Sequence, residues 1–239
     1  MRRAPVATPI LALDVDSVEM AESMMSQVSG LCAFAKVGSE LFTVAGPAVV
    51  RAIRARGWEV FLDLKFHDIP NTVRAAARSA AQLGVRLLTV HASGGRAMIE
   101  AAVEGAGAGC DVFAVTVLTS MDADALAAAT GRRATVGEEV LRLAGIAREG
   151  GARGVVCSGR EAAAVRERHG DTLQRLVPGI RFADGAAHDQ ARVVTPAWAV
   201  ESGANYLVIG RAVTGAPDPA AAMERVLAEL RGVGSVGGE

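Results

Sequence analysis

Short, nearly continuous apolar runs alternate with longer amphipathic segments over almost the whole of this chain. A strand with one wet face alternates apolar and polar residues, whereas a parallel strand covered on both faces is apolar throughout. The amphipathic segments, such as 71–84, place apolar residues on one helical face and arginines on the other. The sequence therefore predicts eight buried parallel strands separated by helices, at residues 10–15, 32–38, 58–66, 86–92, 111–118, 153–158, 173–181 and 205–211.

The number and spacing of these units select the fold. Dividing 239 residues among eight strand–helix units gives about 30 residues per unit, the repeat of a (β/α)8 barrel. A doubly wound open sheet is the alternative, but no Gly-x-Gly-x-x-Gly motif follows the first predicted strand. Neither a linker nor a change in composition divides the chain. We predict an α/β fold, a (β/α)8 TIM barrel forming a single domain over residues 1–231, with a flexible C-terminal tail over 232–239.

The composition excludes several other classes of protein. Hydrophobic residues make up 51% of the chain, as in globular proteins. The net charge of −1 gives no excess of positive charge that would favour binding to nucleic acid or to an anionic membrane. Three widely spaced cysteines (Cys32, Cys110 and Cys157) argue against a disulfide framework. We expect them to be buried residues that only pack in the core. The N-terminus lacks the apolar core of a signal peptide, and no segment reaches membrane-spanning length. We therefore expect a cytoplasmic protein.

Lysine is rare in this chain. Only two of the 25 basic residues are lysines, Lys36 and Lys65. A lysine ammonium can release a proton at reachable cost, which an arginine guanidinium does not do. In a chain this rich in arginine, we expect the lysines to lie where the chemistry needs an ammonium group.

Polar residues gather at the predicted carboxyl ends of the strands, where (β/α)8 barrels carry their chemistry. Single positions keep structural alternatives. His91 can be a core histidine, Ser120 can cap a helix that begins near Met121, and Arg181 and Arg211 can form ion pairs at the rim. The strand-end residues are Asp14, Lys36, Asp63, Lys65, Asp68, His91, Thr119, Ser120, Arg181, Gly210 and Arg211.

The third predicted strand carries the densest group of charges. Residues 63 and 65 of a strand point to the same face, so Asp63 and Lys65 are both expected to face the barrel mouth. Asp68 follows where the chain leaves the strand. An ammonium held between carboxylates stays charged and positioned to donate a proton, and Lys36 on the neighbouring strand can extend the group. The alternative, a purely structural cluster of salt bridges, explains the pattern less well.

The loops after the seventh and eighth predicted strands suit a phosphate. Both combine glycine with arginine, in PGIR (178–181) and IGRAV (209–213). Barrels often bind phosphate at these two loops, where glycine lets backbone N–H groups approach and arginine supplies a forked donor. The polar segment 181–196 between them is long enough to cover a ligand, and Gln190 within it can reach that ligand.

The segment DLKFHDIPNTV (63–73) resembles the signature of the orotidine 5′-phosphate decarboxylase family. The Asp-x-Lys-x-x-Asp core alone is shared with sister phosphosugar enzymes, whereas HDIPNT and the lysine of AKVG are more specific. The 182–188 loop departs from the family pattern. Other matching blocks follow in the family's order: LALDVD (11–16), AKVG (35–38), VHASGG (90–95), VTVLTSM (115–121), VPGIR (177–181), DQARVVTP (189–196) and VIGRAV (208–213).

The resemblance implies an activity and an assembly. The activity is the decarboxylation of orotidine 5′-phosphate to UMP and CO2, the last step of de novo UMP synthesis, without a metal or an organic cofactor. Lys65 is implied to protonate C6 of the substrate within a charged network completed by Asp63, Lys36 and Asp68. The assembly is a homodimer, and its active site is implied to be shared across the interface.

The resemblance also implies the binding residues. Asp68, Ile69 and Thr72 are expected to enter the active site of the partner subunit. Asp14 and Lys36 are expected to contact the ribose, and Thr119 or Ser120 to face the pyrimidine. The phosphate is expected to be held by Arg181, Gln190, Gly210 and Arg211, with Gln190 closing over the base.

Two rival functions are compatible with a phosphate-binding barrel. A sister decarboxylase or synthase that stabilises an enediolate with Mg²⁺ is one, but that branch carries a carboxylate where this chain has Lys36. A non-catalytic phosphate-ligand binding protein is the other. It predicts at least one gap among Asp63, Lys65, Asp68 and Lys36, and the sequence has none.

Overall fold

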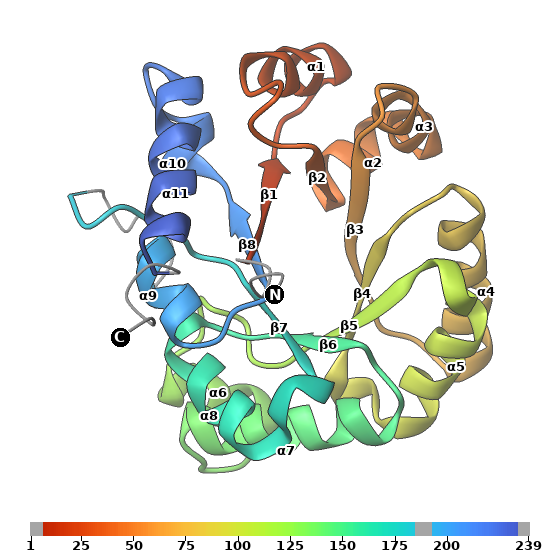
Figure 1. Cartoon of the computed structure of the whole chain (residues 1–239). Coiled ribbons are helices and arrows are strands. Elements are labelled where there is room, and N and C mark those ends of the chain that lie inside the picture. The colour runs from red at the N-terminus through yellow and green to blue at the C-terminus, as the bar shows by residue number, and fades with distance from the viewer. Residues whose placement is uncertain (1–6, 185–192, 234–239) are drawn as a thin grey trace, which may run out of the picture.

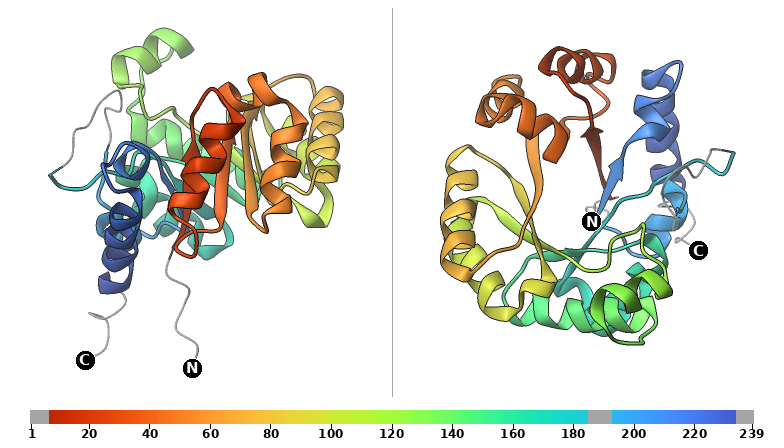
Figure 2. Two further views of the ribbon diagram at one scale, coloured as in Figure 1. Left: turned by 90° about the horizontal axis from the view of Figure 1, so that it is seen from above. Right: turned by 180° about the vertical axis from the view of Figure 1, so that it is seen from behind.

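The computed structural model describes residues 7–184 and 193–233. Eight parallel strands close into a barrel in sequence order, and the helices form a ring around them (Figure 1; Figure 2, right). The (β/α)8 prediction is therefore confirmed, with each predicted strand found within a few residues of its expected place. The strands are β1 (Thr8–Leu13), β2 (Phe34–Gly38), β3 (Glu59–Phe66), β4 (Leu87–His91), β5 (Asp111–Val115), β6 (Gly154–Val156), β7 (Gln174–Val177) and β8 (Tyr206–Ile209).

The helices connect consecutive strands, and in some connections two helices do so. Within the described ranges no helix is long and apolar enough to cross a membrane. The helix α11 continues to Val233, and residues 234–239 lie outside the description. The α-helices are α1 (Val18–Gln27), α2 (Ser39–Ala45), α3 (Pro47–Ala55), α4 (Pro70–Gln82), α5 (Arg96–Ala106), α6 (Ala123–Thr130), α7 (Val136–Glu149), α8 (Gly159–His169), α9 (Pro196–Glu201), α10 (Arg211–Thr214) and α11 (Pro219–Val233), and the 3₁₀ helices are η1 (Ala92–Gly94), η2 (Gly107–Gly109) and η3 (Gly170–Thr172).

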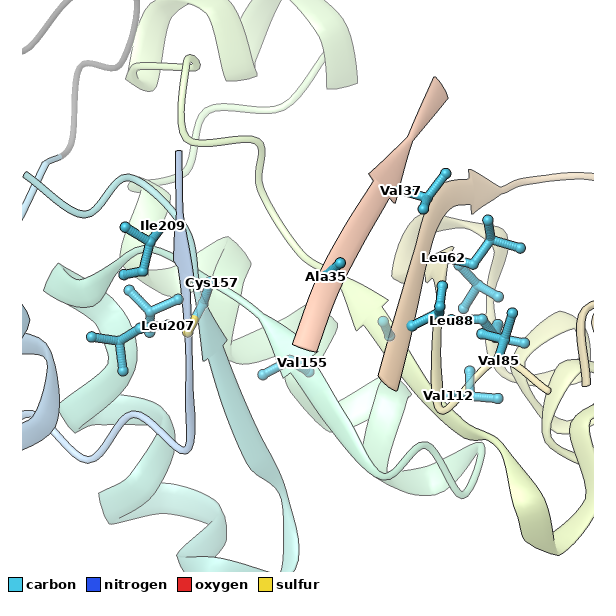
Figure 3. Packing of buried hydrophobic residues seen from close by; sticks show 14 of the residues in the cluster. Ala35, Val37, Leu62, Val85, Leu88, Val112, Val155, Cys157, Leu207 and Ile209 are labelled. Carbon is cyan, nitrogen blue, oxygen red and sulfur yellow. The ribbon is translucent and has the colours of Figure 1, made fainter. Parts of the chain in front are cut away.

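Each strand is apolar throughout because it packs on two cores. In β1, Ile10 and Ala12 belong to the cluster that fills the barrel interior, whereas Leu11 and Leu13 belong to the larger cluster under the helices. Successive side chains of a strand point to opposite faces, so both cores draw on the same run of residues. Figure 3 shows part of the outer cluster, with Leu62 and Leu88 from neighbouring strands close together.

The regular pairing of β3 with β4 breaks at the end of β3. Leu62 pairs with Leu88, but the next paired residue of β3 is Phe66, opposite Val90. Lys65 lies in the part of β3 that is out of register and has a φ of 51°, the only positive φ of a non-glycine residue in the described ranges. The left-handed region costs an L-residue roughly 1–2 kcal/mol, so this conformation persists only where its surroundings hold it. The strained backbone therefore lies at Lys65, the residue that we predict to donate the proton.

The segment after β7 is tied to the segment before α9. Ile180 forms an isolated parallel bridge with Val194. The Arg181 N–H donates to the Val194 carbonyl at 3.0 Å, and the Val194 N–H donates to the Gly179 carbonyl at 3.2 Å. These bonds bring together the two ends of the predicted covering segment, whose residues 185–192 lie outside the described part of the chain.

Candidate active site

A cavity of about 420 Å³ lies at the carboxyl ends of the strands. The apolar part of its wall is formed by Phe61, Val115, Val156, Leu176 and Val208. The other lining residues include most of those that the sequence predicts for the site: Asp14, Lys36, Asp63, Lys65, Thr119, Arg181, Gly210 and Arg211.

Four charged side chains form a continuous chain of alternating sign across β1, β2 and β3. The Lys36 Nζ lies 2.6 Å from Asp14 Oδ1 and 3.8 Å from Asp63 Oδ2. The Lys65 Nζ lies 2.9 Å from Asp63 Oδ1. Asp63 and Lys65 therefore face the barrel mouth together, as the strand periodicity predicts, and Lys36 joins them to Asp14.

Burial differs along this chain of charges. The side chains of Lys36 and Asp63 are 10% and 14% exposed, whereas that of Lys65 is 35% exposed. Charges interact more strongly where water is excluded. The inner pair can therefore act as a fixed support, while the Lys65 ammonium remains accessible to a ligand in the cavity.

A glycine at the end of β2 leaves room for this arrangement. A Cβ at Gly38 would lie 2.9 Å from the Lys36 Nζ and 3.2 Å from the Asp14 Oδ1. Contacts below 3.0 Å are essentially never made by a real Cβ. A side chain at the glycine of the AKVG motif would therefore crowd the Lys36 ammonium and the Asp14 carboxylate, and these two groups would have to shift.

Thr89 is a contributor to the site that the sequence does not reveal. Its hydroxyl donates to Asp63 Oδ1 at 2.9 Å and accepts the Lys65 backbone N–H at 3.0 Å. The only signal in the sequence is a single hydroxyl within the apolar fourth strand, two residues before His91. Because threonine is also an ordinary strand former, that signal does not distinguish a site residue from a structural one.

Two arginines reach the cavity from the loops after β7 and β8. Arg181 is buried, its Nη1 donates to the Ile180 carbonyl at 2.7 Å, and its Nε is buried without a hydrogen-bond partner. Burial and the nearby charge of Arg211 lower the pKa of the Arg181 guanidinium. Among the described residues Arg181 makes no ion pair, contrary to the rim alternative for this residue. Two neighbouring cations with an unused donor suit an anionic ligand.

The turn after β5 separates the two candidates for the pyrimidine contact. Thr119 lines the cavity, whereas Ser120 is exposed and does not line it. The helix-capping alternative for Ser120 is wrong, because α6 begins at Ala123 and is capped by Asp122, whose Oδ1 accepts the Ala125 N–H at 2.8 Å.

The residues that follow β3 point away from the cavity of their own chain. Asp68, Ile69 and Thr72 are exposed and do not line it, and Ile69 is 67% exposed. Asp68 accepts the Ile69 N–H at 2.6 Å and makes no ion pair within the described ranges. The expected contact of Asp68 with Lys65 is therefore not made within one chain. Gln190 lies outside the described residues.

His91 lies near the site without lining the cavity. Its ring lies 5.4 Å from that of His67. Burial, together with the charges of His67 and Lys65, lowers the pKa of His91. A half-buried histidine outside the cavity fits the structural alternative for this residue. The three cysteines are buried and form no disulfide, and Cys157 also lines the cavity. No group of three His, Cys, Asp or Glu residues in the described ranges could hold a metal ion.

Known proteins resemble this chain over nearly its full length. Residues 8–226 match the model of the family described as "Orotidine 5'-phosphate decarboxylase / HUMPS family". Orotidine 5′-phosphate decarboxylase of Halorhodospira halophila is 50% identical over 228 residues, which cover 94% of this chain and 96% of that protein. The enzyme of the same name from Anaeromyxobacter sp. is 53% identical over 219 residues, covering 92% and 96%.

Solved structures give the same result. The crystal structure of orotidine 5′-phosphate decarboxylase from Lactobacillus acidophilus matches with a TM-score of 0.84 and 40% identity, covering 94% of this chain and 99% of that one. The corresponding structure from Pyrococcus horikoshii matches with a TM-score of 0.77 and 29% identity, covering 95% and 100%. Fold and sequence therefore point to one family.

Proposed function

The chain belongs to the orotidine 5′-phosphate decarboxylase / HUMPS family, and we propose that it converts orotidine 5′-phosphate to UMP and CO2, the last step of de novo UMP synthesis. The observation that carries this assignment is the alternating chain Asp14–Lys36–Asp63–Lys65 in a cavity that also holds two arginines. One end of that cavity suits proton delivery and the other suits a phosphate. The protein is thus a carbon–carbon lyase that works without a metal or an organic cofactor.

The reaction needs a cation and a proton at one carbon. When the bond from C6 to the carboxylate breaks, the electron pair stays on C6, where resonance of the pyrimidine does not stabilise it. The Lys65 ammonium stabilises that charge and transfers a proton from Nζ to C6, which forms the C–H bond of UMP. Lys65 is then neutral and regains a proton from solvent before the next turnover.

The other charged residues prepare Lys65 and the substrate. Asp63 holds the Lys65 ammonium at 2.9 Å and, next to the substrate carboxylate, disfavours the ground state relative to the transition state. Lys36 balances Asp63 and, with Asp14, is proposed to contact the ribose hydroxyls. Thr119 faces the pyrimidine, a role that its place in the cavity wall supports over Ser120.

The active site is proposed to be completed by a second subunit of a homodimer. Asp68, Ile69 and Thr72 are exposed at the start of α4, outside the cavity of their own chain, so they are available to a partner. In the dimer, Asp68 of each chain would join the charged network of the other. We further propose that the enzyme is cytoplasmic.

The activity is tested directly with purified protein and orotidine 5′-phosphate. Loss of orotidylate absorbance should match the UMP formed, as measured by chromatography. Folded protein that forms no UMP would contradict the proposed function.

Phosphate binding is expected to contribute to the rate as well as to affinity. Arg211, Arg181, Gly210 and Gln190 are proposed to hold the phosphate, which is remote from C6, so its binding energy can be used to hold C6 against Lys65 in the transition state. Removing a charged hydrogen bond costs about 3 kcal/mol, so Arg211→Ala should lower kcat/KM by about 100-fold and lower kcat too. Steady-state kinetics measure both constants, and Arg51→Ala, on the exposed face of α3, is the matched control. A raised KM with unchanged kcat would show that Arg211 serves binding alone.

Activity is expected to survive an excess of chelator. The Lys36 ammonium already lies between the carboxylates of Asp14 and Asp63, the position that a divalent cation would need. Initial rates should be equal with excess EDTA and with added Mg²⁺. Inactivation by EDTA that Mg²⁺ reverses would favour the Mg²⁺-dependent sister enzymes instead.

A further inference from the structure

The catalytic lysine stands where the barrel loses its regular pairing. Four steps along β3, from Leu62 to Phe66, face only two steps along β4, from Leu88 to Val90. Backbone groups in such an irregularity lack their usual partners on the neighbouring strand. The structure must therefore hold Lys65 by some contact other than the strand ladder.

Thr89 supplies that contact with its side chain. Its Oγ1 accepts the Lys65 N–H at 3.0 Å, which replaces a bond of the ladder. A hydroxyl has one hydrogen to donate, and a backbone N–H can only donate. The Thr89 hydrogen is consequently left for Asp63 Oδ1, at 2.9 Å. One hydroxyl thus connects the backbone of one charged residue to the carboxylate of the other.

The same carboxylate oxygen also receives the Lys65 ammonium. Asp63 Oδ1 lies 2.9 Å from Lys65 Nζ as well as 2.9 Å from Thr89 Oγ1. Thr89 therefore restrains Lys65 twice, directly at its backbone and through Asp63 at its ammonium. Thr89 is fully buried and does not line the cavity, so the hydroxyl itself is not placed to touch the substrate.

We propose that Thr89 is a positioning residue for decarboxylation, whose hydroxyl fixes the relative placement of the Asp63 carboxylate and the Lys65 ammonium. This role rests on the proposed function, because it concerns the group that protonates C6. It also accounts for the strained Lys65 backbone, since the hydrogen bond from its N–H is one of the restraints that hold the residue at a φ of 51°.

Thr89→Val keeps the size and branching of the side chain and removes only the hydroxyl. A misplacement of about 1 Å at a reacting group costs about 100-fold in rate, so kcat should fall by about that factor. KM and the affinity for UMP should change little, because Thr89 does not line the cavity. Thr89→Ser restores the hydroxyl and should recover most of kcat, although it lacks the methyl group.

A second pair of variants covers the case in which valine prevents folding. The side chains introduced by Thr89→Cys and Thr89→Ser are similar in size, but a thiol is only a weak hydrogen-bond donor and acceptor. Cysteine should therefore reproduce the loss of kcat, and serine should not. Melting temperatures of all variants separate rate from stability, since a merely structural role would lower stability without distinguishing the serine variant in kcat.

The outcomes separate this inference from the function on which it rests. Wild-type protein that fails to decarboxylate orotidine 5′-phosphate would overturn both. An active wild type with an equally active valine or cysteine variant would overturn only the role of Thr89. A serine variant as slow as the cysteine variant would do the same, because the hydroxyl would then not be the cause.

Discussion

Lys65→Ala is expected to lose almost all turnover while still binding UMP. A positioned general acid contributes about 10²–10⁴ in rate and electrostatic stabilisation about 10²–10³, so kcat should fall by at least about 10⁴-fold. Asp63 keeps a hydrogen bond from Thr89 and the nearby Lys36 ammonium in this variant, so the fold should survive. Turnover is measured by UMP formation over long incubations, and UMP affinity by calorimetry.

Lys65→Arg is the matched control for this experiment. It keeps the positive charge but carries a guanidinium that does not give up a proton. It should also lose turnover, which would separate the proton from the charge. Alanine-substituted protein with turnover close to that of the wild type would refute the role of Lys65.

A heterodimer of Asp68→Asn and Lys65→Ala chains is expected to regain activity that neither parent has. If each site combines Lys65 of one chain with Asp68 of the other, the heterodimer contains one intact site and one site with both substitutions. Co-expression with two affinity tags isolates this species. By the two-fold symmetry of such an interface, its activity should be about half that of the wild type.

The same geometry supplies a reciprocal control. A heterodimer of wild-type chain with the Lys65→Ala/Asp68→Asn double variant should be nearly inactive, because each of its sites then lacks one residue. If the sites are not shared, the two results exchange: the double-variant heterodimer keeps half the activity, and the first heterodimer has none. Each pattern of activities therefore identifies one arrangement, either sites shared between the subunits or sites contained within one chain.

Much of this protein follows from the spacing of its residues. The strands can be predicted from the sequence because both of their faces are buried. Their apolar runs are therefore nearly continuous, as in β1. The charged part of the site can be predicted because the fold brings the strand ends together. Asp14, Lys36 and Asp63 thereby come into contact from three separate segments. These features depend on periodicity and fold class, which local sequence carries.

Other features depend on contacts that local sequence does not carry. Thr89 becomes a site residue only through the register shift between β3 and β4, which brings its hydroxyl to a segment 24 to 26 residues earlier in the chain. The choice between Thr119 and Ser120 depends on how one turn bends after β5. The role of Asp68 depends on a surface outside its own chain.

The bridge between Ile180 and Val194 has a consequence for how this protein can vary. Because the bridge closes the stem of the segment between them, the backbone of Arg181 is held by hydrogen bonds that do not involve the intervening residues. Substitutions among the intervening residues, apart from the proposed ligand-binding Gln190, can therefore accumulate while these bonds keep Arg181 at the mouth of the barrel.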